Sequence, residues 1–138
     1  MKPFKTLAAS AIFVAIAVPA AFAMDHLAVT GADQDMSGGS VTASMVTAPA
    51  DGWLVVHRTD DAMKPGPVIG HARLMKGENM NVTAQLSEAV KPGEKVMLML
   101  HGEDGGMKAG EFEYSLGAKE DGPVRVDGKL VMAVVTAK

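Results

Sequence analysis

Short apolar segments separated by turn-forming residues follow one another along the whole chain. Each is rich in Val and Leu and is bounded by Gly, Pro or Asp, and no long run repeats its apolar residues every 3.6 positions. Such spacing is typical of strands, so we predict an all-β fold, a single Ig-like antiparallel β-sandwich of about seven to nine short strands. The predicted strands are "HLAVTG", "SVTASMVTA", "GWLVVH", "PVIGHARL", "MNVTAQL", "KVMLMLH", "EFEYSL", "PVRVDG" and "KLVMAVVTA".

The faces of three segments can be predicted from the two-residue period of a strand. "GWLVVH" (52–57) and "KVMLMLH" (95–101) are apolar on both faces, which predicts central strands with one face in the core and the other covered. In "SVTASMV" (40–46), the period places Val41, Ala43 and Met45 on one face and Val46 on the other. "VRVDGKLVM" contains the clearest signal for a two-residue hairpin, at Asp127-Gly128.

The two central segments belong to a pattern that occurs twice. "LVVHRTDDAMKPG" begins at Leu54, and "LMLHGEDGGMKAG" begins 44 positions later at Leu98. Matching residues are Leu54/Leu98, His57/His101, Asp60/Asp104, Met63/Met107, Lys64/Lys108 and Gly66/Gly110. Each copy predicts a strand that ends in His, an acidic loop, and a Met-Lys-x-Gly turn into the next strand. Either a duplication or the pseudo-symmetry of two sheets would produce it.

The first 23 residues are typical of a secretory signal peptide. Lys2 and Lys5 precede an apolar run from Leu7 to Val18, and small residues stand at the positions that a signal peptidase reads in "PAAFA". We therefore predict a signal peptide at 1–23, a β-sandwich domain at 24–138, and a periplasmic or secreted protein. The domain carries 11 basic and 16 acidic residues, a net charge of −5, which argues against nucleic-acid binding. No basic amphipathic segment favours a membrane surface, so no membrane insertion is expected after cleavage.

Histidine and methionine supply the candidate chemistry. The chain has no Cys and 11 Met, 10 of them after the signal peptide. Thioethers select Cu(I), and imidazole binds both copper oxidation states, so a His and Met cluster in an exported protein favours copper as the bound ion. A blue-copper electron carrier is excluded, because its site needs a Cys thiolate. The candidate ligands are His57, His101, Met99, Met63 and Met107. The alternative is that the Met residues fill the core and each His caps its strand by bonding a loop carboxylate.

A separate Cu(II) site is predicted at the mature N-terminus. Cleavage after Ala23 would leave Met24-Asp25-His26, in which the free amine, two amides and the His26 imidazole can form a square-planar ring. No enzyme motif is present: the sequence lacks a nucleophile elbow, a metalloprotease His-Glu-x-x-His helix, a phosphate-binding glycine loop and a dinucleotide fingerprint. We therefore predict a non-enzymatic binding module, with copper as its ligand.

Several stretches resemble a family of exported β-sandwich domains of unknown function, found in surface proteins of halophilic archaea and in small bacterial periplasmic proteins. The resemblance covers roughly residues 40–135. It is carried by Asp51-Gly52-Trp53, Val56-His57, Val68-Ile69-Gly70, Met99-Leu100-His101, Asp104 and Asp121-Gly122-Pro123-Val124. It implies an Ig-like sandwich and an exported location, and no activity.

The composition is also similar to that of periplasmic copper chaperones that bind Cu(I) through His and Met on a β-sandwich. Those carry a His-x-Met pair, whereas the order is reversed in Met99-Leu100-His101, so their ligands are not transferred to this chain. A rival hypothesis is a structural or adhesive surface module that binds another periplasmic or surface protein, or a glycan.

Overall fold

The described residues of the chain form strands and loops. The structure is a computed structural model that describes residues 27–103, 112 and 121–138. The predicted signal peptide (1–23), His26 and Met107 lie outside the described residues. In the described part no helix is long and apolar enough to cross a membrane.

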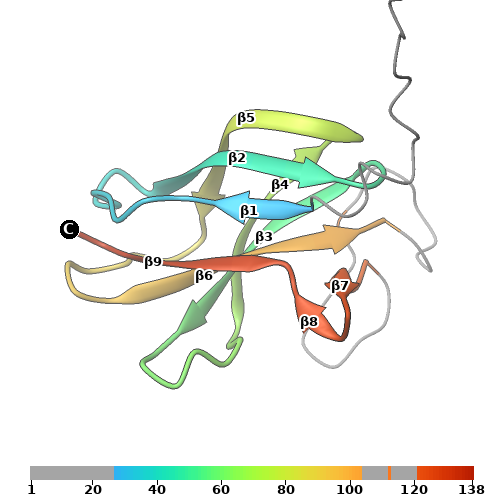
Figure 1. Cartoon of the computed structure of the whole chain (residues 1–138). Coiled ribbons are helices and arrows are strands. Elements are labelled where there is room, and N and C mark those ends of the chain that lie inside the picture. The colour runs from blue at the N-terminus through green and yellow to red at the C-terminus, as the bar shows by residue number, and fades with distance from the viewer. Residues whose placement is uncertain (1–26, 104–111, 113–120) are drawn as a thin grey trace, which may run out of the picture.

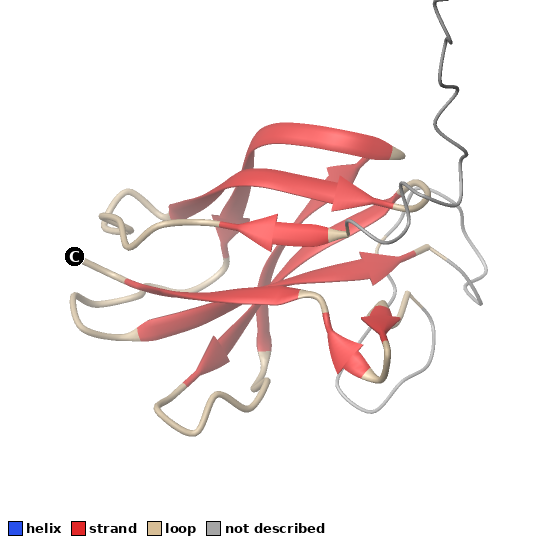
Figure 2. Cartoon of the chain, viewed as in Figure 1, coloured by secondary structure: helices blue, strands red, loops and turns tan. Residues whose placement is uncertain are grey.

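The described residues form nine strands. These strands follow the predicted segments closely (Figure 2). Their bounds are β1 Ala28–Thr30, β2 Ser40–Ala48, β3 Gly52–Thr59, β4 Val68–Leu74, β5 Gly77–Leu86, β6 Lys95–Gly102, β7 Arg125–Val126, β8 Lys129–Leu130 and β9 Met132–Thr136. The segment "KLVMAVVTA" is divided between β8 and β9, and "EFEYSL" lies outside the described residues apart from Phe112. The prediction of an all-β, antiparallel, sandwich-like fold is confirmed.

Seven strands form one sheet that folds back on itself. Their order is β1-β2-β5-β4-β3-β6-β9, and each neighbouring pair is antiparallel. The β4–β5 ladder has only two paired positions, Gly70 with Leu86 and His71 with Gln85, so the sheet turns there. At the opposite side an isolated bridge joins Gln34 to Ala137, which brings the two edges together. Figure 1 shows the resulting layers, with β1, β2 and β5 facing β3, β6 and β9.

The hydrophobic core lies between these two layers. One face of each central strand contributes to it, with Leu54 and Val56 on β3 and Leu98 and Leu100 on β6, all at most 1% exposed. The facing layer contributes small side chains such as Val41 from β2. The other face of β3 and β6 is buried as well, since nearly every residue of both strands is inaccessible. The prediction of central strands covered on both faces is therefore confirmed.

The alternation along β2 changes phase in the middle of the strand. Val41 and Ala43 are buried as predicted, but beyond Ser44 the core residue is Val46, whereas Met45 is only half-buried. The neighbouring strand β5 has a left-handed residue at this level, because Asn81 has φ of 51°. The prediction that Met45 shares the face of Val41 was therefore wrong, because this local twist reverses the side-chain alternation that a regular strand keeps.

The predicted hairpin at Asp127-Gly128 is confirmed. β7 and β8 pair through Arg125 with Leu130 and Val126 with Lys129, which leaves two residues in the turn. Both turn residues have positive φ, 52° for Asp127 and 79° for Gly128. This is the conformation of a type I′ turn, which the right-handed twist of a hairpin favours and which Asp-Gly adopts readily.

Candidate functional site

The outer face of β3 and β6 carries the candidate ligands. Three rows of cross-strand partners lie on this face: Trp53 with His101, Val55 with Met99, and His57 with Met97. All six side chains are at most 5% exposed, and none belongs to the main core between the layers. We call this set the outer-face cluster. It exists because "WLVVH" and "MLMLH" pair antiparallel in a register that aligns their odd-numbered residues.

His57 and His101 occupy diagonal corners of the outer-face cluster. They lie on adjacent antiparallel strands, so the ends of β3 and β6 that carry them are at opposite ends of the ladder. Their rings nevertheless reach toward each other across the middle row of Val55 and Met99. The Nε2 atoms are 3.4 Å apart, and the ring centroids are 5.5 Å apart with planes tilted by 31°. The two histidines of the duplicated pattern therefore meet at one place.

Each imidazole is oriented by a hydrogen bond from Nδ1 to a backbone carbonyl. His57 Nδ1 donates to Gly66 O at 2.8 Å, and His101 Nδ1 donates to Asp121 O at 2.6 Å. A carbonyl accepts only, so both rings carry a hydrogen on Nδ1, and the neutral form of each has its lone pair on Nε2. Both Nδ1 atoms therefore bond to backbone carbonyls.

Two irregular segments bring these carbonyls into place. The β3–β4 register shifts between Val56 and His57, and the loop beyond Thr59 returns so that Gly66 N donates to Arg58 O at 2.8 Å. At the other corner Asp121, itself 1% exposed, has φ of 50°, and His101 forms an isolated bridge with Pro123. Backbone geometry at two loops thus fixes both imidazole orientations.

Burial keeps both histidines neutral. Removal from water disfavours the charged ring and lowers the pKa of His57. The hydrogen bond to Gly66 acts in the opposite direction and is the smaller effect. Burial likewise lowers the pKa of His101 to about 4, with the charge of His57 contributing in the same direction. At neutral pH both rings are therefore unprotonated, as a metal-binding imidazole must be.

Two buried methionines complete the central part of the cluster. Met99 lies in the middle row, across which the imidazoles meet, and Met97 is the cross-strand partner of His57. Their side chains are 1% and 0% exposed. Met99 was predicted as a candidate ligand, and the structure places it on the same face as both histidines.

An aromatic group adjoins the His101 corner. The Trp53 ring lies 5.4 Å from the His71 ring and 5.6 Å from Phe112, and Arg73 stacks over Trp53 at 5.2 Å. Arg73 also pairs with Glu103 at 3.1 Å. These residues were not predicted as part of a site. The β4 positions share a face with Trp53 through the β3–β4 register, which pairs Val55 with His71, and that register cannot be read from a single segment.

The remaining predicted ligands lie elsewhere or outside the described residues. Met63 is 50% exposed in the loop after β3, where it has φ of 57°. Met107 and His26 are outside the described residues. In the described ranges no group of three or more His, Asp or Glu side chains gathers as a metal cluster.

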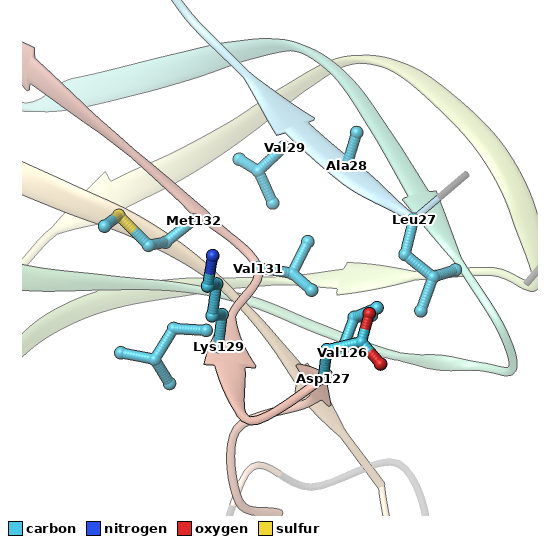
Figure 3. A pocket seen from close by; sticks show the side chains of 9 residues that line it. Leu27, Ala28, Val29, Val126, Asp127, Lys129, Val131 and Met132 are labelled. Atoms are coloured by element: carbon cyan, nitrogen blue, oxygen red, sulfur yellow. The ribbon is translucent and has the colours of Figure 1, made fainter. Parts of the chain in front are cut away.

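A second concave surface lies away from the histidines. Figure 3 shows this groove, which has a volume of about 440 Å³ and runs between β1 and the β7–β8 hairpin. Its lining combines apolar residues of β1, β8 and β9 with Asp127 and Lys129. Among the described residues, the lining of this groove includes no His side chain.

Comparisons with known proteins identify a family and assign no activity. No curated protein and no solved structure matches the chain. A family model described as "Domain of unknown function (DUF7282)" matches residues 27–138, which include every described strand and both histidines of the outer-face cluster. The chain therefore belongs to the DUF7282 family of domains of unknown function.

Proposed function

We propose that this chain is an exported, non-enzymatic binding module that holds one copper ion between His57 and His101. The observation that carries the proposal is the approach of the two Nε2 atoms to 3.4 Å, with both Nδ1 atoms bonded to carbonyls. Two neutral imidazoles in this arrangement direct their lone pairs toward each other. A cation placed between the two Nε2 atoms would relieve the repulsion between these lone pairs. Metal-binding imidazoles commonly carry a carbonyl on the other ring nitrogen, as both rings do here.

The separation of the nitrogens is within the span that one metal ion can bridge. With metal–nitrogen bonds of about 2 Å, a 3.4 Å separation encloses an angle of about 115° at the metal. This value is close to trigonal and tetrahedral geometry and far from linear. The ion therefore requires at least one further ligand in addition to the two imidazoles.

The adjoining thioethers favour Cu(I) as that ion. Met99 lies in the row between the histidines, and Met97 faces His57 across the strands. Soft thioether ligands select Cu(I), whereas Zn²⁺ favours thiolate, imidazole and carboxylate. We assign Met99 as the third ligand, because its row lies between the rows of the two histidines. Met63 is omitted because its side chain is half-exposed in a loop.

Competition titration tests the proposal. Purified protein lacking residues 1–23 is titrated with Cu(I) and with Cu(II) against a coloured chelator of known affinity. We expect one Cu(I) per chain at the outer-face cluster, bound more tightly than the competitor. If the chelator retains all of the metal in both oxidation states, the copper function is wrong.

Substitution of Met99 tests the third ligand. Met99→Leu preserves volume and apolarity, so we expect the free energy of unfolding to change by less than about 1.5 kcal/mol. Loss of the thioether should lower Cu(I) affinity by about 10-fold or more, with a smaller effect on Cu(II). The measurement is the same competition titration, paired with urea denaturation. Met36→Leu is the matched control, because Met36 is also buried, at 2% exposed, but packs in the main core. Equal Cu(I) affinities for the two variants would contradict the assignment of Met99.

Substitution of Gly66 tests the carbonyl that orients His57. A Cβ on Gly66 would lie 2.7 Å from Arg58 O, so Gly66→Ala must displace the loop and its carbonyl. We expect the free energy of unfolding to fall by about 1–3 kcal/mol. Copper affinity should fall by about 10-fold, since partners that orient metal ligands carry effects of this size. Gly38→Ala is the control, because a Cβ there meets no atom within 4 Å. Unaltered affinity in Gly66→Ala would exclude a role for this carbonyl.

The predicted Cu(II) site at His26 is independent of the outer-face cluster. It depends on cleavage after Ala23, which the intact mass of the exported protein decides. An N-terminus at Met24 supports this site, and any other removes it, since the imidazole must be at the third position.

The rival function is a structural or adhesive module that contacts another protein or a glycan. It is supported by the groove between β1 and the β7–β8 hairpin (Figure 3). The two functions are separated by the copper titration, because groove binding requires neither His57 nor His101.

A further inference from the structure

We propose that His71 is the entry ligand that delivers the metal to the His57–His101 pair. This inference rests on the proposed copper function and adds a surface step to it. The pair itself is nearly inaccessible, with His57 1% and His101 0% exposed. Because a metal exchanges one ligand for another as it moves between sites, a buried pair needs an accessible donor beside it.

The sheet register places His71 next to the pair. His71 is the cross-strand partner of Val55, and Val55 is in turn the partner of Met99. A single row therefore runs from His71 through Val55 to the proposed thioether ligand. This row is the one across which the two buried imidazoles meet. Cross-strand neighbours on one face have Cβ atoms about 5 Å apart, so His71 lies one strand away from the centre of the site.

His71 is also open to solvent, unlike the other two histidines of this face. It lines a hollow of about 470 Å³ at the corner where the sheet turns from β4 to β5, together with Gln85 and Ser87. A metal carried by a donor molecule can approach an imidazole in such an open concave surface.

Aromatic rings connect His71 with the buried pair. Phe112 lies 4.8 Å from the His71 ring and 6.0 Å from the His101 ring, and the His101 ring is 5.5 Å from that of His57. Trp53 contacts both His71 and Phe112. Phe112 therefore lies beside both His71 and His101, so the exposed imidazole and the buried pair adjoin the same aromatic side chain.

The test measures the rate of loading separately from the final affinity. The full mature protein is mixed rapidly with Cu(I) held by a weak coloured chelate, and loss of colour is followed in time. We expect His71→Gln to slow transfer by about 10-fold or more, because an entry ligand raises the local metal concentration at the pair. The equilibrium affinity should remain within about threefold of wild type, since His71 is not among the final ligands.

Gln85→Ala is the matched control. Gln85 lies opposite His71 in the β4–β5 ladder and lines the same hollow, but it carries no imidazole. The Gln85→Ala variant should take up Cu(I) at the wild-type rate. Equal rates of Cu(I) transfer for His71→Gln and wild type would overturn the proposal. A loss of equilibrium Cu(I) affinity in His71→Gln that is large enough to explain its slower transfer would overturn it too. Failure of wild type to bind Cu(I) overturns the proposed function itself, whereas normal binding with an unchanged rate overturns only the entry role.

Discussion

Replacing His101 by Gln is expected to lower Cu(I) affinity by about 100-fold or more. His101 would supply one of three proposed ligands, and even partners that only orient a metal ligand are worth about 10–100-fold. His57→Gln should have an equal effect, because the two rings contribute equivalent Nε2 atoms at 3.4 Å. The affinity is measured by chelator competition, after circular dichroism has established that each variant retains its strand content.

The control for this pair is His71→Gln, which removes an imidazole from the same face without touching the proposed ligand set. It should retain wild-type equilibrium affinity. Full affinity in either His57→Gln or His101→Gln, in a protein that is folded, would contradict the assignment of the buried pair.

Acidification is expected to destabilise the metal-free protein well above the pH at which carboxylates titrate. His101 has a pKa of about 4 in the folded state, against about 6.5 when unfolded. Between these values the unfolded chain binds a proton that the folded chain does not, so stability falls as pH falls from 6.5 toward 4. Above pH 6.5 the ring is neutral in both states, so it does not make the free energy of unfolding depend on pH. His57, whose pKa is also lowered, acts in the same direction. From His101 alone we expect a loss of about 2–3 kcal/mol between pH 7.5 and 4.5.

Urea denaturation at a series of pH values, with a chelator present, measures this loss. The His101→Gln variant should show a much flatter dependence over the same window, because its side chain does not titrate. If the free energy of unfolding depends on pH equally in wild type and His101→Gln, His101 is not kept neutral by burial.

The sequence predicted the strands well because each carries its own local signal. Apolar runs bounded by Gly, Pro or Asp predicted β3 and β6 as central strands, and Asp127-Gly128 predicted the hairpin turn. The duplicated pattern also identified His57 and His101 as related positions. These signals are local in sequence, so a single chain is sufficient to read them.

The assembly of the site was not predictable, because it depends on register and on backbone atoms. Antiparallel neighbours place His57 and His101 at opposite ends of a ladder, and only the observed register brings their Nε2 atoms to 3.4 Å. The carbonyls of Gly66 and Asp121 belong to the backbone, so residue type does not indicate that they accept hydrogen bonds from the two imidazoles. The prediction for Met45 failed for a similar reason. The left-handed Asn81 on the neighbouring strand β5 accompanies a change in which residues of β2 face the core, and a two-residue period does not predict such a change.

X-ray absorption of the Cu(I)-loaded protein tests the central claim most directly. Two imidazole nitrogens at about 2.0 Å and one sulfur at about 2.3 Å are expected, with the multiple scattering that imidazole rings produce. A copper ion without imidazole scattering, or one with sulfur ligands alone, would contradict the claim that His57 and His101 hold the metal.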